Sequence, residues 1–204
     1  MFKIAVLVSG NGTDLQSIID AIKSGYIENC TIEAVISDRK GSFGIERAAC
    51  IGIPTYVFER KIYKENLSDE ICSLLQGRVD LIVLAGWLSI LRGKLLKVFQ
   101  SRIINIHPSL IPSFCGSGMY GIKVHEKVLQ YGVKISGCTV HFVDEDTDRG
   151  PIIIQKSVPV LDDDTPQSLQ KRVLEKEHIA LPEAVKLISE NKVTIQERKV
   201  TIRR

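Results

Sequence analysis

Short apolar runs alternate with amphipathic segments through the first half of the chain. Runs typical of strands lie at five places, Lys3–Val8, Thr31–Ser37, Thr55–Phe58, Asp80–Ala85 and Ile103–His107. Helical periodicity separates them, with helices expected from Thr13, through Ile45–Cys50 and over about Ile62–Leu75. Strands and helices that alternate at this spacing are typical of βαβ units. The pattern therefore predicts an α/β fold with a doubly wound, mostly parallel, Rossmann-like sheet.

The segment after the first strand carries signals for both ends of a helix. Thr13–Gln16 matches a capping box, in which a Ser or Thr side chain caps the first turn and a Glu or Gln three residues later bonds back to it. Gly25 fits the residue that follows a helix C-terminus. Four apolar side chains between these signals share one helical face, Leu15, Ile18, Ile19 and Ile22.

The second half of the chain has a different pattern. Two longer strand-like runs, Lys134–Val143 and Ile152–Val160, flank an acidic turn at 144–150 and predict an antiparallel edge in the C-terminal half of the sheet. A long helix is expected from Thr165–Pro166, with inward side chains at Leu169, Val173, Ala180, Ala184 and Leu187. The tail repeats Lys-Val-Thr-Ile at 192–195 and 199–202, which either a terminal hairpin or coincidence explains.

Composition is that of an ordinary globular protein. The 204 residues are 44% hydrophobic and 25% charged, which excludes a disordered chain and a coiled coil. The formal charge of +3 is too small and too evenly spread to indicate nucleic acid. No apolar run reaches the ~18 residues that a membrane span needs. Since no Pro- or Ser-rich linker divides the chain, we expect one domain over 1–204, with halves at 1–100 and 101–190 and a tail at 191–204.

The cysteines indicate a reducing environment. They are odd in number, widely spaced and without a C-x-x-C pair, at Cys30, Cys50, Cys72, Cys115 and Cys138. This favours reduced thiols in a cytoplasmic protein over disulfides or a zinc site. Each cysteine is expected to be a small buried hydrophobe.

A glycine-containing turn, Ser9–Thr13, joins the first strand to the first helix. Free N–H groups and the positive end of a helix dipole make such a turn an anion site. A tight turn that needs Gly for its backbone angles is equally consistent. Leu15 stands where a dinucleotide fingerprint needs its third Gly, and no Gly-Lys-Ser/Thr follows. A monophosphate therefore fits this turn better than a pyrophosphate.

Asn105 and His107 are the strongest candidates for chemistry. Alternate residues of a strand point to the same face, so the two side chains project together. Pro108 should end strand pairing there, at the carboxyl edge where open α/β sheets bind ligands. A core histidine beside a turn asparagine is the alternative. Asp148 lies just before the Gly-Pro of the acidic turn, whose other carboxylates, Asp144, Glu145 and Asp146, are expected to be solvated. Composition does not separate Asp148 from these neighbours.

Four motifs follow one another along the chain: S-G-N-G-T-x-L-Q, L-A-G-W, N-I-H-P-S-L at 105–110 and H-F-V-D-E-x-x-D-x-G-P-I-I-x-Q at 141–155. Together they resemble the phosphoribosylglycinamide formyltransferases of the formyltetrahydrofolate-dependent formyltransferase family. The resemblance runs from about residue 2 to the helix at 165–190. N-I-H-P-S-L alone marks only the wider group of formyltetrahydrofolate hydrolases and transferases, and the first motif and the chain length narrow it.

The resemblance implies roles for particular residues. The catalytic trio of the family matches Asn105, His107 and Asp148, and a second histidine close to the site matches His141. Ribonucleotide binding is implied for Glu177 and for the phosphate turn, Gly10, Asn11, Gly12, Thr13 and Asp14. A pocket for the pterin of folate is implied for Leu84, Trp87, Leu88, Ile90, Leu91, Ile103 and Val143. The halves 1–100 and 101–190 are then the phosphate- and nucleotide-binding half and the catalytic and folate-binding half.

The implied reaction transfers the formyl group of 10-formyltetrahydrofolate, a co-substrate, to the amine of glycinamide ribonucleotide in de novo purine biosynthesis. Asn105 and a protonated His107 would stabilise the oxyanion that forms. Asp148 would keep the His107 ring protonated and accept the proton that the amine loses. No metal is expected, because no metal-ligand cluster is visible. Two alternatives stay open: a formyltetrahydrofolate hydrolase, which uses water in place of the amine, and a non-catalytic nucleotide-binding module.

Two positions depart from the family pattern. Asp14 replaces an Asn that often follows the phosphate turn, and Ser89 stands where some relatives have Arg. The glycine-rich segment 113–121 is typical of a mobile lid. The expected partners are the two small-molecule substrates, with neither nucleic acid nor a membrane. We expect a cytoplasmic enzyme, as a monomer or a homodimer.

Overall fold

The computed structural model describes residues 1–203, in two compact units. The first unit is Met1–Asn105 and the second runs from Ile106 onward, so the division falls within one strand, β5 (Ile103–His107). This lies close to the expected boundary between the halves at 100 and 101. The seven strands of the main sheet are hydrogen-bonded in the order β3-β2-β1-β4-β5-β6-β7. That one domain spans the whole chain stays a prediction.

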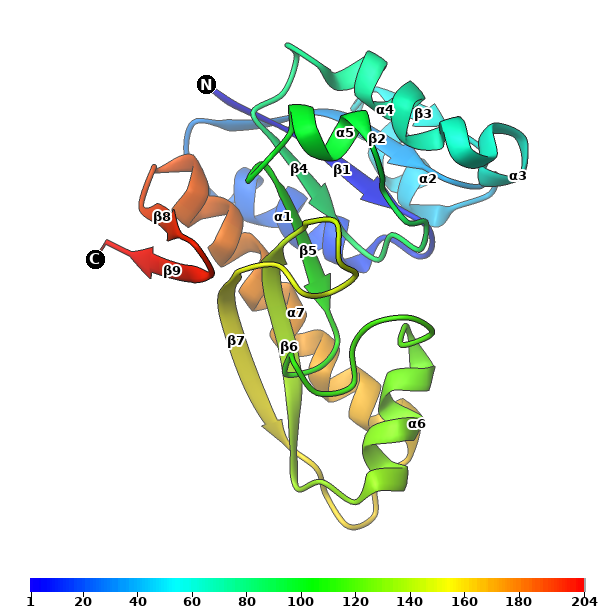
Figure 1. Ribbon diagram of the computed structural model, residues 1–204, viewed down its shortest axis with the longest axis vertical. Coiled ribbons are helices and arrows are strands. Elements are labelled where there is room, and N and C mark those ends of the chain that lie inside the picture. The colour runs from blue at the N-terminus through cyan, green and yellow to red at the C-terminus, as the bar shows by residue number, and fades with distance from the viewer. Residues whose placement is uncertain (204) are drawn as a thin grey trace. The chain divides into compact units, whose positions relative to one another are not determined.

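Parallel strands and helices alternate through the first unit (Figure 1). Its elements are β1 (Phe2–Val8), α1 (Thr13–Lys23), β2 (Cys30–Ser37), α2 (Phe43–Ala49), β3 (Thr55–Val57), α3 (Arg60–Tyr63), the 3₁₀-helix η1 (Lys64–Asn66), α4 (Leu67–Leu75), β4 (Leu81–Leu84) and α5 (Lys94–Val98), followed by β5. The strand order reverses between β1 and β4, and every pair from β3 to β5 is parallel. The predicted doubly wound, mostly parallel sheet is therefore confirmed.

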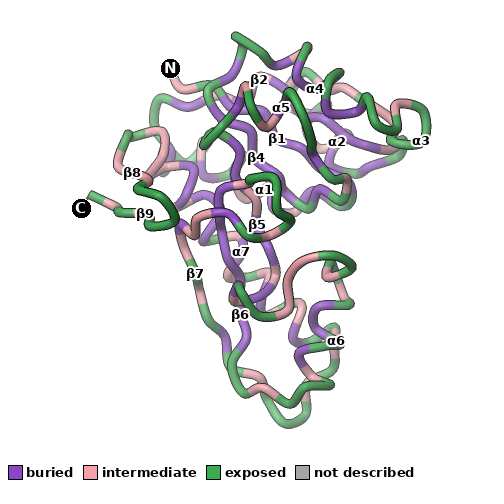
Figure 2. The backbone as a smooth tube through the Cα atoms, viewed as in Figure 1, coloured by how far each residue is buried: buried purple, intermediate pink, exposed green. Residues whose placement is uncertain are grey.

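The core of the first unit surrounds its two central strands, which Figure 2 shows as buried. Residues Ile4–Val8 of β1 and all four residues of β4 are buried, as continuous apolar runs predict for a parallel strand covered on both faces. Leu15 and Ile18 of α1 have no exposed area, and Ile22 is half-buried. The amphipathic face expected for this helix is thus confirmed, except at its last position.

Two predictions about the helices of the first unit are wrong. The helix expected over 62–75 is broken, because Lys64 adopts a positive φ of 46° between α3 and α4. The reason is burial: α4 buries five side chains, whereas α3 and η1 bury none. The capping box at Thr13 is also absent. Gly12, at φ 68°, is the N-cap of α1, and no side chain caps it. Gly25 does follow the end of α1 and has φ 77°.

The second unit pairs two antiparallel strands with a long helix. Its elements are α6 (Ile122–Tyr131), β6 (Ile135–Phe142), β7 (Ile152–Pro159), α7 (Pro166–Ser189), β8 (Val193–Gln196) and β9 (Lys199–Ile202). α7 runs along β6 and β7 (Figure 1). The antiparallel edge is confirmed, and of the two explanations for the repeated tail the structure has the hairpin, β8–β9. α6 has no counterpart among the predicted helices.

The start of α7 follows the sequence signals closely. The Thr165 side chain accepts a hydrogen bond from the Ser168 backbone N–H at 3.1 Å, and the Thr165 N–H donates one to Ser168 Oγ at 2.9 Å. Pro166 occupies the first turn, where its missing N–H costs nothing. Leu169, Val173, Ala180 and Ala184 are fully buried, and Leu187 is half-buried.

All five cysteines are free thiols. Cys30, Cys72 and Cys138 are buried, as expected, but Cys50 is exposed and Cys115 is half-buried. Cys50 follows the last residue of α2, where the chain faces solvent, so the expectation of burial is wrong there. Among residues 1–203, no helix combines the length and the apolarity that crossing a membrane would demand.

Candidate active site

The turn between β1 and α1 is held by its carbonyl groups. The Gly10 carbonyl accepts hydrogen bonds from Ser42 Oγ at 2.9 Å and from the Gly44 N–H at 3.2 Å. The Asn11 carbonyl accepts one from Arg47 Nε at 2.8 Å. A side chain at Gly12 would place its Cβ 2.6 Å from the Gly44 Cα, so this crossing requires Gly. The turn is therefore fixed against α2 from one side.

The N–H groups of the same turn remain open. Those of Asn11, Gly12 and Thr13 donate to no backbone or side-chain acceptor in the described part of the chain. They stand at the N-terminus of α1, an 11-residue helix whose dipole favours negative charge there. Unsatisfied N–H groups at a helix N-terminus are what a phosphate needs. The geometry thus suits an anion.

Asp14 lies in the first turn of α1, and only 8% of its surface is exposed. Burial raises the pKa of its carboxyl group to about 7. The group therefore titrates near neutral pH, far above the ordinary range of an aspartate. An uncharged Asp14 removes the repulsion that an ionised carboxylate at this position would exert on a phosphate.

Asn105 and His107 end β5. Alternate residues of a strand share a face, so the two side chains project to the same side. Asn105 pairs in register with Leu84 of β4 and is half-buried, whereas only 4% of His107 is exposed.

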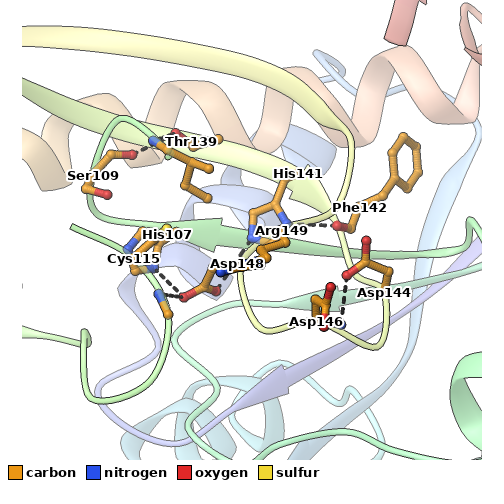
Figure 3. Close-up of polar contacts among 12 residues, drawn as sticks. His107, Ser109, Cys115, Thr139, His141, Phe142, Asp144, Asp146, Asp148 and Arg149 are labelled. Carbon is orange, nitrogen blue, oxygen red and sulfur yellow. Dashed lines mark hydrogen bonds and ion pairs between the residues drawn. The ribbon is translucent and has the colours of Figure 1, made fainter. Parts of the chain in front are cut away.

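His107 is held between a backbone carbonyl and the carboxylate of Asp148, which Figure 3 shows beside its ring. Its Nε2 lies 2.9 Å from the Phe114 carbonyl oxygen, and its Nδ1 lies 3.6 Å from Asp148 Oδ2. A carbonyl oxygen only accepts, so Nε2 carries a hydrogen and donates it. A proton on Nδ1, facing Asp148, is then present only in the charged imidazolium form.

Asp148 bridges two histidines. Its Oδ1 lies 3.8 Å from Nε2 of His141, on the other side from His107. The Gly116 N–H donates to Oδ2 at 2.9 Å, and the backbone of Asp148 has a positive φ of 56°. The carboxylate is thereby fixed between both rings by its own turn and by the segment around Gly116.

His141 is oriented in the same way as His107. Its Nδ1 donates to the Phe142 carbonyl oxygen at 2.8 Å, which leaves Nε2 toward Asp148. Burial lowers the pKa of His141, while the Phe142 carbonyl and the Asp148 charge act in the opposite direction. His107, Asp148 and His141 therefore form a cluster, called here the His-Asp-His cluster, that can take up and hand on a proton.

His125 was missed by the sequence analysis. It lies on α6, with 1% of its surface exposed. Burial, and then the positive charge of His107, lower the pKa of His125 to about 4, so its ring is neutral at ordinary pH. No signal pointed to it, because the sequence predicted no helix over 122–131.

Two other contacts were also not predicted from the sequence. Arg198, in the β8–β9 turn, donates to the Arg149 carbonyl at 2.6 Å, next to Asp148. Ser89, at the second departure from the family pattern, donates to Asp38 Oδ2 at 2.6 Å.

The residues assigned to folate differ in exposure. Leu88 and Ile90 are exposed by 40% and 53%, and Val143 is half-buried. The others lie in the interior, namely Leu84, Trp87, Leu91 and Ile103. Trp87 Nε1 is a buried donor without a partner among the described residues. Glu177, assigned to the ribonucleotide, is buried on α7.

The carboxylates that precede Asp148 in its turn lie at the surface. Asp144, Glu145 and Asp146 are exposed, which confirms that they are solvated. Within residues 1–203, no group of three or more His, Cys, Asp or Glu side chains is arranged to hold a metal ion.

Known formyl transferases are similar to this chain in sequence and in structure. The profile of the formyl transferase family matches residues 2–185. The phosphoribosylglycinamide formyltransferase of Haemophilus influenzae is 40% identical over 200 residues, 97% of this chain and 92% of that protein. The crystal structure of glycinamide ribonucleotide transformylase 1 from Symbiobacterium toebii superposes with a TM-score of 0.92 at 41% identity, covering 99% of this chain and 94% of that one.

Two other groups of relatives are longer than this chain. The human trifunctional purine biosynthetic protein adenosine-3 is 39% identical over 96% of this chain, which spans 19% of that protein. A formyltetrahydrofolate deformylase from Pseudomonas syringae has a TM-score of 0.89 at 27% identity, covering 98% of this chain and 65% of that one. The chain belongs to the formyl transferase family, in its phosphoribosylglycinamide formyltransferase group.

Proposed function

We propose that this chain transfers the formyl group of 10-formyltetrahydrofolate to the amine of glycinamide ribonucleotide, in de novo purine biosynthesis. The observation that carries the proposal is the His-Asp-His cluster at the end of β5, in a chain of this family. Formyl transfer to an amine needs no nucleophile from the protein. It needs a group that accepts the proton of the amine and donors for the oxygen on which charge develops.

Asp148 is the proposed proton acceptor. Its carboxylate is held at 3.6 Å and 3.8 Å from two ring nitrogens, neither of which bears a hydrogen when its ring is neutral. A proton that reaches the cluster from the amine is therefore shared between the carboxylate and a ring. The cluster can return this proton to the folate nitrogen that leaves.

Asn105 and His107 are the proposed donors to the reacting oxygen. Asn105 offers an amide N–H from the same face of β5. Both ring nitrogens of His107 already face protein oxygens, so His107 must exchange the Phe114 carbonyl for the reacting oxygen. Phe114 belongs to segment 113–121, in which Gly116, Gly118 and Gly121 have positive φ angles. A shift of this segment would release Nε2, in keeping with the expected lid.

The phosphate of the ribonucleotide is proposed to bind the turn at Gly10–Asp14, whose N–H groups are open. Glu177 is proposed to contact the same substrate. The exposed side chains of Leu88 and Ile90 and the unpartnered Trp87 Nε1 suit a flat ring that has both apolar and polar edges, as the pterin of folate has. These residues would bind and orient the formyl donor. The free thiols support a cytoplasmic location, and we retain a monomer or a homodimer as the proposed assembly.

One assay tests the proposal. The protein is mixed with 10-formyltetrahydrofolate with and without glycinamide ribonucleotide, and the folate absorbance is followed. We expect consumption of the formyl donor only when the ribonucleotide is present. Consumption without it would indicate the hydrolase activity that the deformylase relative suggests. Ribonucleotide binding without any turnover would indicate a nucleotide-binding module.

A further inference from the structure

Arg47 stands directly behind the glycine turn of the first unit. It lies on α2, and its Nε donates to the Asn11 carbonyl at 2.8 Å. A Cβ added at Gly12 would lie 3.6 Å from its Cδ, so the stem of the side chain covers that glycine. Arg47 thus donates to the Asn11 carbonyl, and its stem occupies the side of Gly12 on which a Cβ would stand.

A second contact fixes the guanidinium group. Arg47 Nη1 donates to Gln16 Oε1 at 3.3 Å. Gln16 Nε2 in turn donates to Asp20 Oδ1 at 2.9 Å, which sets the amide so that its oxygen faces Arg47. A chain of hydrogen bonds therefore runs from α1 through Gln16 and Arg47 to the carbonyl of Asn11.

The contact with Arg47 also determines the direction in which the N–H groups of the turn point. In a trans peptide the C=O of one residue and the N–H of the next point in opposite directions. Because the Asn11 carbonyl points to Arg47, the Gly12 N–H points away from α2. The Gly10 carbonyl points to Ser42 and Gly44, so the Asn11 N–H also points away from α2.

The charge of Arg47 adds to this effect. Arg47 forms no ion pair with any carboxylate among residues 1–203, so its positive charge next to the turn is not neutralised by the protein. Nothing in the sequence marked Arg47, which lies 36 positions from Asn11.

We propose that Arg47 is a positioning residue for the phosphate of the ribonucleotide. It holds the Asn11 carbonyl, and through that peptide it keeps the Gly12 N–H aimed at the phosphate. This inference rests on the proposed function, in which the turn binds glycinamide ribonucleotide. Formyl-folate binding and the chemical step do not depend on Arg47.

The test is a steady-state comparison of three variants. Arg47→Met keeps the apolar stem over Gly12 but removes the donors and the charge. Arg47→Lys restores the charge and one donor. Arg78→Met is the control, because Arg78 is an arginine of the first unit that likewise donates to a backbone carbonyl, that of Leu74, but it is exposed and lies away from the turn. We expect the KM for glycinamide ribonucleotide to rise about tenfold in Arg47→Met, the effect of losing one hydrogen bond to a charged group.

Other constants should stay near those of the wild type. The kcat and the KM for 10-formyltetrahydrofolate should change less than twofold, Arg47→Lys should recover part of the affinity, and Arg78→Met should have no effect. An analogue without the phosphate, glycinamide ribonucleoside, should be used equally poorly by the wild type and by Arg47→Met. The proposal would be overturned if Arg47→Met had the wild-type KM for the ribonucleotide. It would also be overturned if the substitution weakened use of the analogue as much as use of the ribonucleotide.

The outcome is separable from that of the proposed function. If the wild type does not turn over, calorimetric titration with the ribonucleotide still compares the two proteins, and equal affinity rejects the role of Arg47. If Arg47→Met does not fold, Arg47→Lys is the test, with an expected increase of about threefold in KM for the ribonucleotide alone. A change in kcat instead would count against positioning of the phosphate.

Discussion

In both the glycine turn of the first unit and the His-Asp-His cluster of the second, hydrogen bonds to backbone carbonyl groups determine which polar groups stay available. The two sites use the available groups for opposite purposes. In the turn, carbonyl groups are occupied by Ser42, Gly44 and Arg47, which leaves backbone N–H groups open. In the cluster, backbone carbonyls occupy one nitrogen of each ring, which leaves the other nitrogen toward Asp148. One site consists of donors for an anion, and the other consists of acceptors for a proton.

The two regions differ in what a substitution can remove. The turn acts through backbone atoms, so only a change in its geometry or its supports affects it. The cluster acts through three side chains, and each can be replaced singly. We therefore expect the largest losses of turnover in the cluster and the largest losses of affinity in the turn.

Replacement of Asp148 by Asn should give the largest effect. The amide keeps the shape of the side chain and can still accept from the Gly116 N–H, so thermal unfolding should hardly change. It has no charge and does not accept a proton, so kcat should fall by ~10²- to 10⁴-fold, the usual contribution of general acid–base catalysis. Asp146→Asn, in the same turn but exposed, is the control. Near-normal kcat in Asp148→Asn would remove Asp148 from the mechanism.

Replacement of Gly12 by Ala should damage the turn. An Ala at φ 68° is strained by about 1 kcal/mol, and its Cβ would lie 2.6 Å from the backbone of Gly44. We expect unfolding free energy to fall by roughly 2 kcal/mol and the KM for the ribonucleotide to rise more than the KM for formyl folate. Gly10→Ala is the control, since an added Cβ there meets nothing within 4 Å. Equal behaviour of the two variants in urea unfolding would contradict this account.

Replacement of Asp14 by Asn should change the pH dependence of the turn. Burial raises the pKa of Asp14 from 3.8 to about 7, so the folded state binds its proton more tightly than the unfolded state. The contribution of the protonated carboxyl group to the free energy of unfolding is fully present below pH 4. It is lost as the pH rises toward 7, by at most roughly 4 kcal/mol. The variant should match the wild type at pH 4 and be more stable at pH 8.

The same titration should be visible in binding. As the wild-type carboxyl group ionises through pH 7, its charge should weaken the binding of a phosphate dianion, and the KM for the ribonucleotide should rise. In Asp14→Asn that rise should be absent between pH 6 and 8. Parallel pH profiles for the two proteins, in melting temperature and in KM, would show that the buried carboxyl group does not govern this dependence.

The sequence predicted the parts that local rules determine. The parallel sheet followed from continuous apolar runs such as β4, and the start of α7 followed from Thr165 and Pro166. Asn105 and His107 were paired in advance because strand geometry places alternate residues on one face. Gly12 was noted as a turn residue, but its close approach to Gly44 depends on packing between distant segments. The capping box at Thr13 failed because Gly12, and not Thr13, is the N-cap of α1.

Long-range contacts account for what was missed. The family resemblance named Asp148, yet nothing local shows that it lies between His107 and His141, because the β6–β7 hairpin brings it there. α6, with His125, carries few sequence signals, since only Val124, His125 and Val128 are buried along its length. Arg47 and Arg198 donate hydrogen bonds to backbone carbonyl groups. Because every residue has such a group, the sequence pattern does not show which one an arginine will contact.

The smallest predicted effect concerns Arg198, which supports the cluster from outside as Arg47 supports the turn. Its bond to the Arg149 carbonyl holds the peptide between Arg149 and Gly150, one residue beyond Asp148, whose positive φ must be maintained. An exposed hydrogen bond of this kind contributes about 0.5–1.5 kcal/mol, so Arg198→Ala should lower kcat by roughly two- to tenfold. KM values should hardly change. Arg203→Ala, directly after β9, should leave kcat unaltered, and Arg198→Lys should recover part of the loss. If Arg198→Ala instead raised the KM for the ribonucleotide at constant kcat, the hairpin would act on affinity. That result would contradict the expectation that the turn governs affinity and the cluster governs turnover.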